Sequence, residues 1–354
     1  MTTTKAFAGA RSLTRARWTD YLRMARLDHM TKHVFILPGI VLAWVLRAPQ
    51  GLAEAKHAMG NPMLEAGHAW PAGVMALVMT LMVGLSSAVL VASANYILNE
   101  WLDRSFDAFH PDKSGRPAVT VQMSPWPVWA GYVGCSVAGL ALATEVGPVF
   151  FATSLLFWLS GVIYNVRPLR TKDLPYLDVL SESMNNPIRL MLGWSMVDPT
   201  SVAPASLLLA YWMGGAFLMG AKRLSEYREI SAGPGVGVLH RYRRSFRHYT
   251  QERLLVSCFV YALLSTLLIG FFLVKYRIEY LVGCPFVIAL FAHYLALSLR
   301  SGSVAQKPEK LFKERTLMAL TGSAVLALAA LSFVSIPRLH GLTEPTFLTI
   351  ERMR

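Results

Sequence analysis

The sequence predicts an all-α integral membrane protein, in which several hydrophobic helices cross the bilayer side by side. Of its 354 residues, 54% are hydrophobic and only 16% are charged, which is far too apolar for an ordinary soluble domain. Several apolar runs approach the roughly 20 residues that a helix needs to cross a bilayer. The excess of Lys and Arg, a formal net charge of +13, is concentrated in alternate loops, as in multi-pass proteins.

The apolar runs predict nine membrane spans that form one catalytic domain over residues 33–336. A basic cytoplasmic segment, residues 1–32, precedes this domain, and a short tail, residues 337–354, follows it. The predicted spans are 33–48, 72–98, 127–145, 148–165, 178–197, 203–220, 254–274, 279–299 and 317–336.

The distribution of basic residues predicts the orientation of these spans. With the N-terminus inside, residues 1–32 and the loops after the second, fourth, sixth and eighth spans hold 26 of the 34 Lys and Arg. This bias predicts a cytoplasmic-membrane protein with its N-terminus inside and its C-terminus outside. The same bias explains the positive charge through the anionic membrane surface, so nucleic acid is not an expected partner.

A stripe of polar side chains continues the second span. Asn95, Asn99, Asp103 and Asp107 follow one another at four-residue steps, so a helix would place them on one face. Two carboxylates and an amide are the oxygen ligands that Mg²⁺ accepts. We therefore expect Asn99, Asp103 and Asp107 to hold Mg²⁺, with Asn95 contacting the substrate.

Two cations follow this stripe. Lys113 and Arg116 come soon after the helix is interrupted at His110-Pro111. A metal on one side and an ammonium and a guanidinium on the other form a site for diphosphate, which makes Asp103, Asp107, Lys113 and Arg116 the candidate catalytic residues. The alternative is a solvated helix end, but polar side chains continuing a membrane span are usually functional.

Further basic residues lie on the predicted cytoplasmic side. Arg167, Arg170 and Lys172 surround Pro168 in the loop after the fourth span. They are either an ordinary positive-inside loop or a phosphate-binding lip that faces the loop after the second span. Lys32 lies next to the first span, close enough to reach a cytoplasmic cavity.

The fifth span is unusually polar. Asp178, Glu182, Asn185 and Arg189 share one face at three- and four-residue spacing, and charges on one face of a span point into a bundle interior or a wet cavity. A structural ion pair between Glu182 and Arg189 is the alternative.

The end of the sixth span carries Lys222, Arg223 and Glu226. Lys222 and Glu226 are spaced to pair along a helix. The segment 240–253 that follows is basic and aromatic, and it predicts a helix on the membrane surface.

Together these motifs resemble the UbiA-type intramembrane prenyltransferases. The resemblance rests on Asn99-xxx-Asp103-xxx-Asp107 followed by Arg116-Pro117 at the cytoplasmic end of the second span. It implies nine transmembrane helices around a central cavity that opens to the cytoplasm, and a Mg²⁺-bound diphosphate substrate under a cytoplasmic cap.

One branch of that superfamily is particularly similar. Most members carry a second Asp-rich motif after the sixth span, whereas this chain has Lys222-Arg223-Leu-Ser-Glu226 there. With His110-Pro111-x-Lys113-x-x-Arg116, this resembles the decaprenyl-phosphate phosphoribosyltransferases. The resemblance implies Mg²⁺-dependent transfer of 5-phosphoribosyl from its diphosphate to a polyprenyl phosphate, for cell-envelope glycan precursors. The expected substrate-binding residues are Asn95, Lys32, Arg167, Arg170, Lys172, Glu182, Arg189, Lys222, Arg223 and Glu226.

Two alternatives remain open from the sequence. The stretch Pro168-Leu-Arg-x-Lys172 is similar to relatives that transfer a prenyl group from its diphosphate to an aromatic or lipid acceptor, as in quinone biosynthesis. That reaction would use the same first motif. A cation-coupled transporter is the non-enzyme alternative, because paired membrane carboxylates also serve ion pathways.

Overall fold

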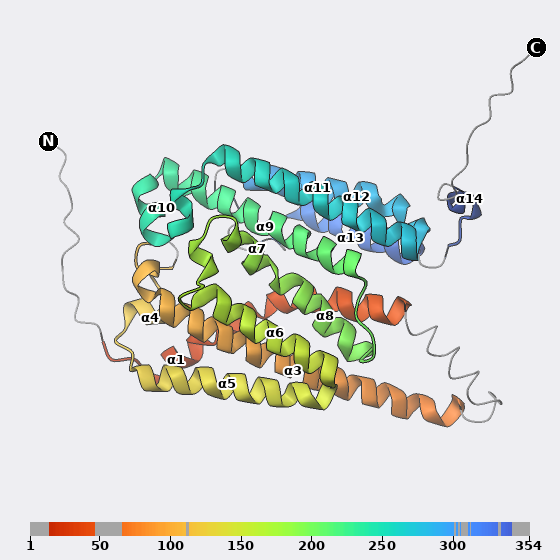
Figure 1. Cartoon of the computed structure of the whole chain (residues 1–354), viewed down its shortest axis with the longest axis horizontal. Helices are drawn as coiled ribbons and strands as arrows, with labels where there is room; N and C mark the ends of the chain where they lie inside the picture. Colours follow the sequence, from red (N-terminus) through yellow and green to blue (C-terminus); the bar gives the residue numbers. More distant parts are fainter. Residues whose placement is uncertain are drawn as a thin grey trace, which may run out of the picture.

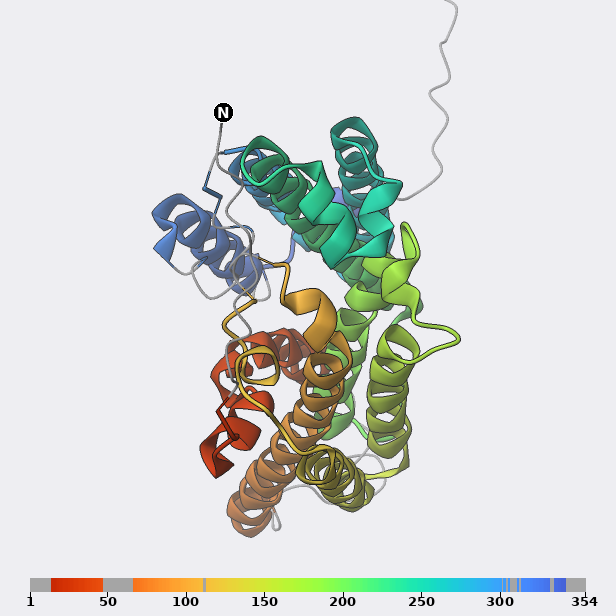
Figure 2. The same ribbon diagram turned by 90° about the vertical axis from the view of Figure 1, so that its left-hand side faces the viewer.

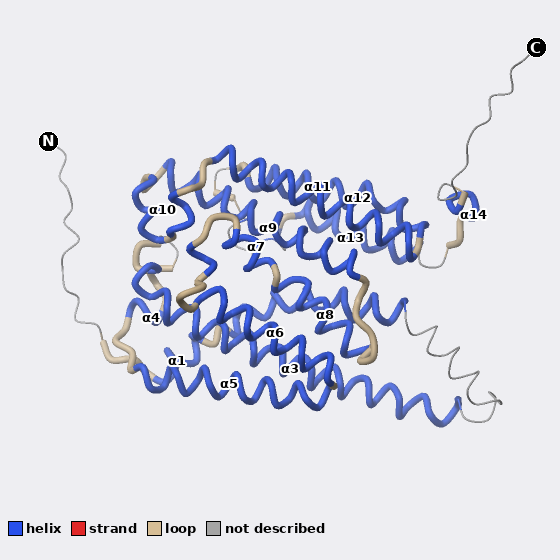
Figure 3. The backbone as a smooth tube through the Cα atoms, viewed as in Figure 1, coloured by secondary structure: helices blue, strands red, loops and turns tan. Residues whose placement is uncertain are grey.

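The computed structural model is a bundle of helices, and it describes residues 14–46, 66–110, 113–300, 302–303, 305, 311, 313–331 and 334–341. The described residues form no β-strand (Figure 3), and Arg15 and Gln122 make an isolated bridge. The helices in chain order are α1 (Trp18–Met24), η1 (Leu27–Ile36), α3 (Ala66–Asp107), α4 (Pro117–Thr120), α5 (Pro125–Val146), α6 (Pro148–Asn165), η2 (Thr171–Asp173), α7 (Leu177–Ser183), α8 (Asn185–Val197), α9 (Ala205–Ala232), α10 (Val236–Tyr242), η3 (Arg244–Arg247), α11 (Gln251–Tyr276), η4 (Ile278–Gly283), α12 (Cys284–Ser298), α13 (Arg315–Leu331) and α14 (Pro337–His340).

Five helical segments in the described chain are long and apolar enough to cross a membrane. They are Val74–Asp107, Pro125–Val146, Pro148–Asn165, Gln251–Tyr276 and Ile278–Ser298, and each contains or nearly matches a predicted span. The apolar helices Lys32–Leu46 and Arg315–Leu331 are shorter. The chain is therefore a multi-pass membrane protein, while nine crossings and their orientation stay predictions.

The fifth predicted span, 178–197, is not one continuous helix. It consists of α7 and α8, with Met184 between them as the boundary residue. Pro187 explains the interruption, because it has no N–H to donate to the carbonyl of Ser183 and its ring crowds that carbonyl. The polar face expected along this span is therefore divided between two helices.

The turn between α5 and α6 shows how the sequence places consecutive helices side by side. Gly147 has a φ of +142°, a conformation that side chains rarely adopt. Pro148 follows at the first position of α6, where its missing N–H costs no helical hydrogen bond.

The long helices run roughly along one axis (Figure 1), and Figure 2 views the bundle from the end that carries α4 and α10. α3 packs against α5 and α6, and α9 packs against α11. Between these groups, α8 contacts α3, α6, α9 and η1.

Two glycines bring η1 and its continuation close to α8. A Cβ on Gly39 would lie 1.9 Å from the carbonyl oxygen of Leu190, and one on Gly193 would lie 2.1 Å from that of Ile36. Only glycine permits such a close backbone approach. As a result, the start of the first predicted span, with the polar residues that it carries, lies against α8.

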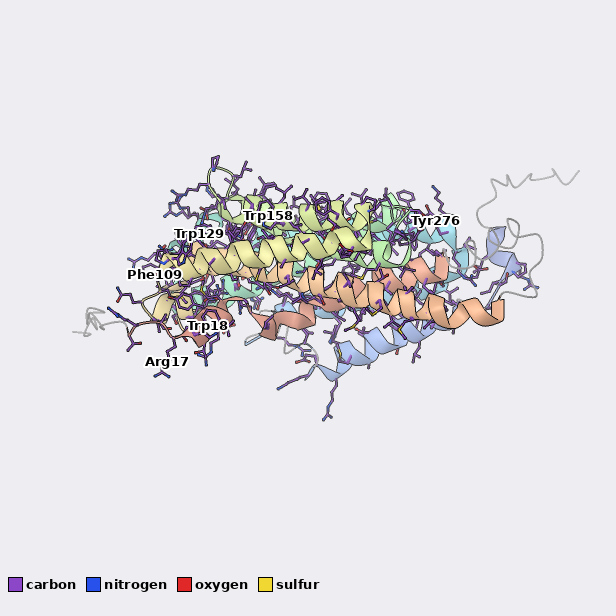
Figure 4. All side chains as sticks on the ribbon, turned by 90° about the horizontal axis from the view of Figure 1, so that it is seen from below. Arg17, Trp18, Phe109, Trp129, Trp158 and Tyr276 are labelled. Atoms are coloured by element: carbon purple, nitrogen blue, oxygen red, sulfur yellow. The ribbon has the colours of Figure 1, made fainter. Side chains whose placement is uncertain are left out.

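The outer surface of the bundle is apolar, as a lipid-facing surface must be. Val256, Phe259, Leu263 and Leu267 on α11 are all exposed. Aromatic side chains lie near both ends of the bundle, Trp18, Phe109 and Trp129 at one and Tyr276 at the other (Figure 4), which is typical of membrane–water interfaces.

Part of the predicted N-terminal segment belongs to the bundle. Met24 of α1 is buried with Ile97, Ala118 and Val128. Residues 18–24 thus pack onto α3, α4 and α5.

Candidate functional site

The candidate site lies at the end of the bundle where α3 finishes. α4, the segment 166–176, the last turns of α9, and α10 with η3 all lie at this end (Figure 1). The polar stripe is on a single helix, because α3 continues through Asp107.

Asp107 is buried, with 2% of its surface exposed, and Nη1 of Arg116 lies 2.5 Å from its Oδ2. Arg116 is the residue immediately before α4. Glu100, one turn from Asp103, accepts a hydrogen bond from the backbone N–H of Ala118 at 3.3 Å. These contacts fix the loop after α3 against the stripe.

Asp103 is bound by the segment after α6. Nη2 of Arg170 lies 2.8 Å and Nζ of Lys172 lies 2.5 Å from its Oδ1. Arg170 also donates to Asp173 at 3.1 Å and to the carbonyl of Asn165. This basic segment is therefore more than a positive-inside loop, since two of its cations directly contact the stripe.

The two amides of the stripe connect α3 to α6. Nδ2 of Asn99 donates to Oδ1 of Asn165 at 2.6 Å, and Nδ2 of Asn95 donates to the carbonyl of Phe157 at 2.9 Å. Lys172 also donates to Oδ1 of Asn165 at 2.7 Å. Asn165 thus links the amide of the stripe to the basic segment.

The donor set fits a Mg²⁺ ion. Both cations on Asp103 use Oδ1, and Arg116 uses Oδ2 of Asp107, which leaves Asp103 Oδ2 and Asp107 Oδ1 without a hydrogen bond from any described residue. These two oxygens and the amide oxygen of Asn99 are hard ligands of the kind that Mg²⁺ prefers. Among the described residues no three Asp, Glu, His or Cys side chains form a metal-binding group, so the metal would rely on substrate oxygens and water for its other ligands.

Lys113 lies beside this pair of carboxylates. Its Nζ is 5.0 Å from the ring centre of Tyr242, and the ring of His110 packs edge-on against the same tyrosine. Burial lowers the pKa of Lys113 to about 7. Burial likewise lowers the pKa of Lys172 to about 8, although Asp103 opposes this shift. Both lysines would gain protons when an anion binds.

A second network is centred on Arg223, a residue that is 1% exposed. Its nitrogens lie 3.4 Å from Asp178, 2.6 Å from Glu182 and 2.9 Å from Glu226. Arg243 adds a further ion pair to Asp178 at 3.2 Å. From the sequence we predicted that Arg223 binds a substrate phosphate. In this structure the charge of Arg223 is already balanced by carboxylates.

Both ion pairs that the sequence offered as alternatives are absent among the described residues. Glu182 bonds Arg223 and the hydroxyl of Tyr164, not Arg189. Glu226 bonds Arg223 and Tyr242, not Lys222. Arg223 lies three residues before Glu226 on α9, so helical spacing allowed that pair as well. The partners of Glu182, Arg223 and Tyr164, come from other segments and could not be predicted from spacing along one helix.

The other predicted site residues fall into two groups. Lys32 lies over the ring of Tyr96 at 5.3 Å, and Arg189 and Lys222 also lie within the bundle, where Glu226 and Glu182 act on Lys222. Arg167, by contrast, is exposed.

The segment 240–253 was predicted to lie on the membrane surface, and that prediction is wrong for its central part. Tyr242, Phe246 and Tyr249 are buried in one hydrophobic cluster, and Ser245 and Tyr249 donate hydrogen bonds to Asp178. Its basic composition suggested lipid headgroups, whereas the four- and three-residue spacing of Tyr242, Phe246 and Tyr249 was the overlooked signal for a buried face.

The fold and the site define a multi-pass, all-helical membrane protein with a carboxylate and cation cluster at one end of its bundle. The chain belongs to the UbiA prenyltransferase family, whose model matches residues 58–320.

Curated relatives agree with this assignment. The chain is 26% identical over 246 residues to protoheme IX farnesyltransferase of Geobacillus sp. (strain WCH70), covering 68% of this chain and 71% of the relative. It is 31% identical over 141 residues to the nodulation protein NoeC of Azorhizobium caulinodans, covering 40% of this chain and 44% of that protein.

Solved structures share the fold. A UbiA homolog from Archaeoglobus fulgidus bound to GPP and Mg²⁺ superposes with a TM-score of 0.60 at 21% identity, covering 91% of this chain and 99% of the homolog. A digeranylgeranylglyceryl phosphate synthase superposes with a TM-score of 0.52 at 10% identity, covering 89% and 95% of the two chains.

Proposed function

We propose that the protein transfers a prenyl group from a Mg²⁺-bound polyprenyl diphosphate to an aromatic or lipid acceptor, at the cytoplasmic face of the membrane. One observation carries this proposal. Asp103 and Asp107 each keep one oxygen without a hydrogen bond from the described residues, while Arg170, Lys172 and Arg116 contact their other oxygens. Carboxylates with cations beside them suit a metal–diphosphate complex.

In this proposal Asn99, Asp103 and Asp107 would hold the Mg²⁺, which when bound would neutralise charge on the diphosphate. Arg116, Lys113, Arg170 and Lys172 donate hydrogen bonds to the diphosphate oxygens and stabilise the charge that they gain. These cations come from two separate loops, so the diphosphate would be enclosed on two sides.

Three comparisons support a prenyl donor. The family description names prenyl transfer, the first relative is named a farnesyltransferase, and a structural neighbour was solved with GPP and Mg²⁺. Arg223, which the phosphoribosyl hypothesis would place on the 5-phosphate, is bound by three carboxylates, those of Asp178, Glu182 and Glu226. Family membership speaks against a cation-coupled transporter.

A second candidate is transfer of 5-phosphoribosyl to a polyprenyl phosphate for cell-envelope precursors. It is favoured by Lys222, which forms no ion pair within the described residues and lies near Glu182 and Glu226. A cation without a dedicated partner at the usual position of a second acidic motif suits an additional phosphate.

The two candidates are separated by offering both donors to the purified, full-length protein in lipid vesicles. One set of reactions contains labelled farnesyl diphosphate with an aromatic acid or a lipid acceptor, and the other contains labelled 5-phosphoribosyl diphosphate with polyprenyl phosphate. We expect Mg²⁺-dependent product in the first set and none in the presence of EDTA. Product only in the second set would establish the phosphoribosyl reaction, and product in neither would refute both.

A further inference from the structure

Arg189 is a buried cation without a counter-ion among the described residues. It lies on α8 with 7% of its surface exposed, and its Nε has no hydrogen-bond partner. Its guanidinium carbon is 5.0 Å from the ring centre of Phe157. No ion pair within the described residues includes it, although every other buried arginine of the site, Arg170 and Arg223, binds at least two carboxylates. Burying an unpaired charge is costly.

Among the described residues, the groups that act on the charge of Arg189 include no acid. The hydroxyls of Tyr96 and Tyr211 interact with its charge, and so does His33, whose Nδ1 is also buried without a partner. Lys32 acts on the same histidine. The surroundings are therefore aromatic, polar or cationic, and they favour an anion supplied from outside the chain.

Four elements enclose this position. α8 contacts α3, α6, α9 and η1, and the close approach at Gly39 and Gly193 holds η1 against it. Tyr96 precedes Asp103 by seven residues on α3, which is about 10 Å along the helix axis. Arg189 on α8 thus lies near Tyr96, at a level of α3 that is separate from the diphosphate cluster and deeper in the bundle.

We propose that Arg189 binds the anionic group of the acceptor substrate, a carboxylate or a phosphate. This rests on the transfer reaction proposed above, because a transferase needs its acceptor near the donor. The planar guanidinium binds either group in a bidentate manner. Phe157, Tyr96 and Tyr211 provide the aromatic surface for the apolar body of the acceptor.

Arg189 could alternatively serve only to pack against Phe157. A packing role makes its effect independent of the charge of any ligand. Binding of anions therefore has to be compared with binding of neutral molecules of the same shape.

The experiment measures binding by calorimetry to the purified full-length protein. The probes are 4-hydroxybenzoate with its neutral amide, and decaprenyl phosphate with decaprenol. Mg²⁺ with geranyl diphosphate is titrated separately to report the donor site. The variants are Arg189→Gln and the charge-conserving Arg189→Lys. Arg104→Gln, the same change at an exposed arginine of α3, is the matched control.

We expect the wild type to bind one anion at least about tenfold more tightly than its neutral partner, and the anion that binds identifies the acceptor class. Arg189→Gln should lose this preference, Arg189→Lys should keep part of it, and Arg104→Gln should keep all of it, with donor binding unchanged throughout.

Two results would overturn the inference. One is a wild type that binds each anion no more tightly than its neutral analogue, a comparison that needs no variant to fold. The other is an Arg189→Gln protein that retains the preference. Failure to bind Mg²⁺ with geranyl diphosphate would instead refute the proposed donor, while the anion comparison still reports on Arg189.

Discussion

Nη2 of Arg170 lies 2.8 Å from Oδ1 of Asp103 and joins two residues that are 67 positions apart in the chain. The contact brings a basic loop onto the acidic stripe. It therefore makes Asp103 part of a charged cluster. This cluster includes both the candidate metal ligands and the cations that would donate hydrogen bonds to the diphosphate.

Asp103→Asn should lower kcat by at least about 100-fold, since the amide removes both a metal ligand and the charge that balances the metal. Asp173→Asn is the matched control, because Asp173 also binds Arg170 but lies outside the stripe. The measurement is Mg²⁺-dependent turnover, with the melting temperature of each variant recorded. Equal activity in both variants would exclude Asp103 as a ligand.

Arg223→Met should destabilise the protein by roughly 3–5 kcal/mol, because it leaves buried carboxylates without their cation. A lower melting temperature in detergent, compared with the exposed control Arg104→Met, would show this effect. If Arg223 instead served a substrate phosphate, the variant would melt like the wild type and lose only activity.

Lys113 should make donor binding depend on pH. Burial favours its neutral form and lowers its pKa to about 7, so the ammonium is present below that pH and is lost above it. The KM for the diphosphate donor should therefore rise between about pH 6 and pH 8.5. Arg stays protonated throughout this range, so Lys113→Arg should flatten that rise. An unchanged profile in this variant would assign the dependence to another group.

Cysteines at two exposed positions should test the orientation. Pro234→Cys follows α9 and should react with an impermeant reagent only from the cytoplasmic side. Val202→Cys precedes α9, is exposed and should react only from outside. The reversed pattern would overturn the prediction from basic residues, and the unmodified protein controls for its three native cysteines.

Composition and helical spacing were enough to predict the all-helical membrane fold and the helical stripe. Both signals are local, because a span is a run of apolar residues and Asn99, Asp103 and Asp107 are separated by single turns. The family resemblance also followed from these residues and was confirmed. The interruption of the fifth predicted span at Met184 was not predicted, although Pro187, which explains it, is visible in the sequence.

Partners across the bundle could not be predicted in the same way. Helical spacing suggested the pairs Glu182–Arg189 and Lys222–Glu226. Arg223 instead binds both glutamates, Glu226 from one turn away on α9 and Glu182 across the bundle. Which residues meet depends on how α7, α9 and the segment after it pack together. That packing depends on contacts between segments that are far apart in the sequence. The spacing of residues within one segment does not reveal those contacts.

The carboxylate of Asp178 has a further consequence for biogenesis. Its partners Arg243, Ser245 and Tyr249 follow it by 65, 67 and 71 residues. During synthesis the carboxylate is made well before any of them, and an isolated charge is costly away from water. Asp178 therefore has to stay hydrated until α9 and the segment after it have been made, so this part of the bundle closes late.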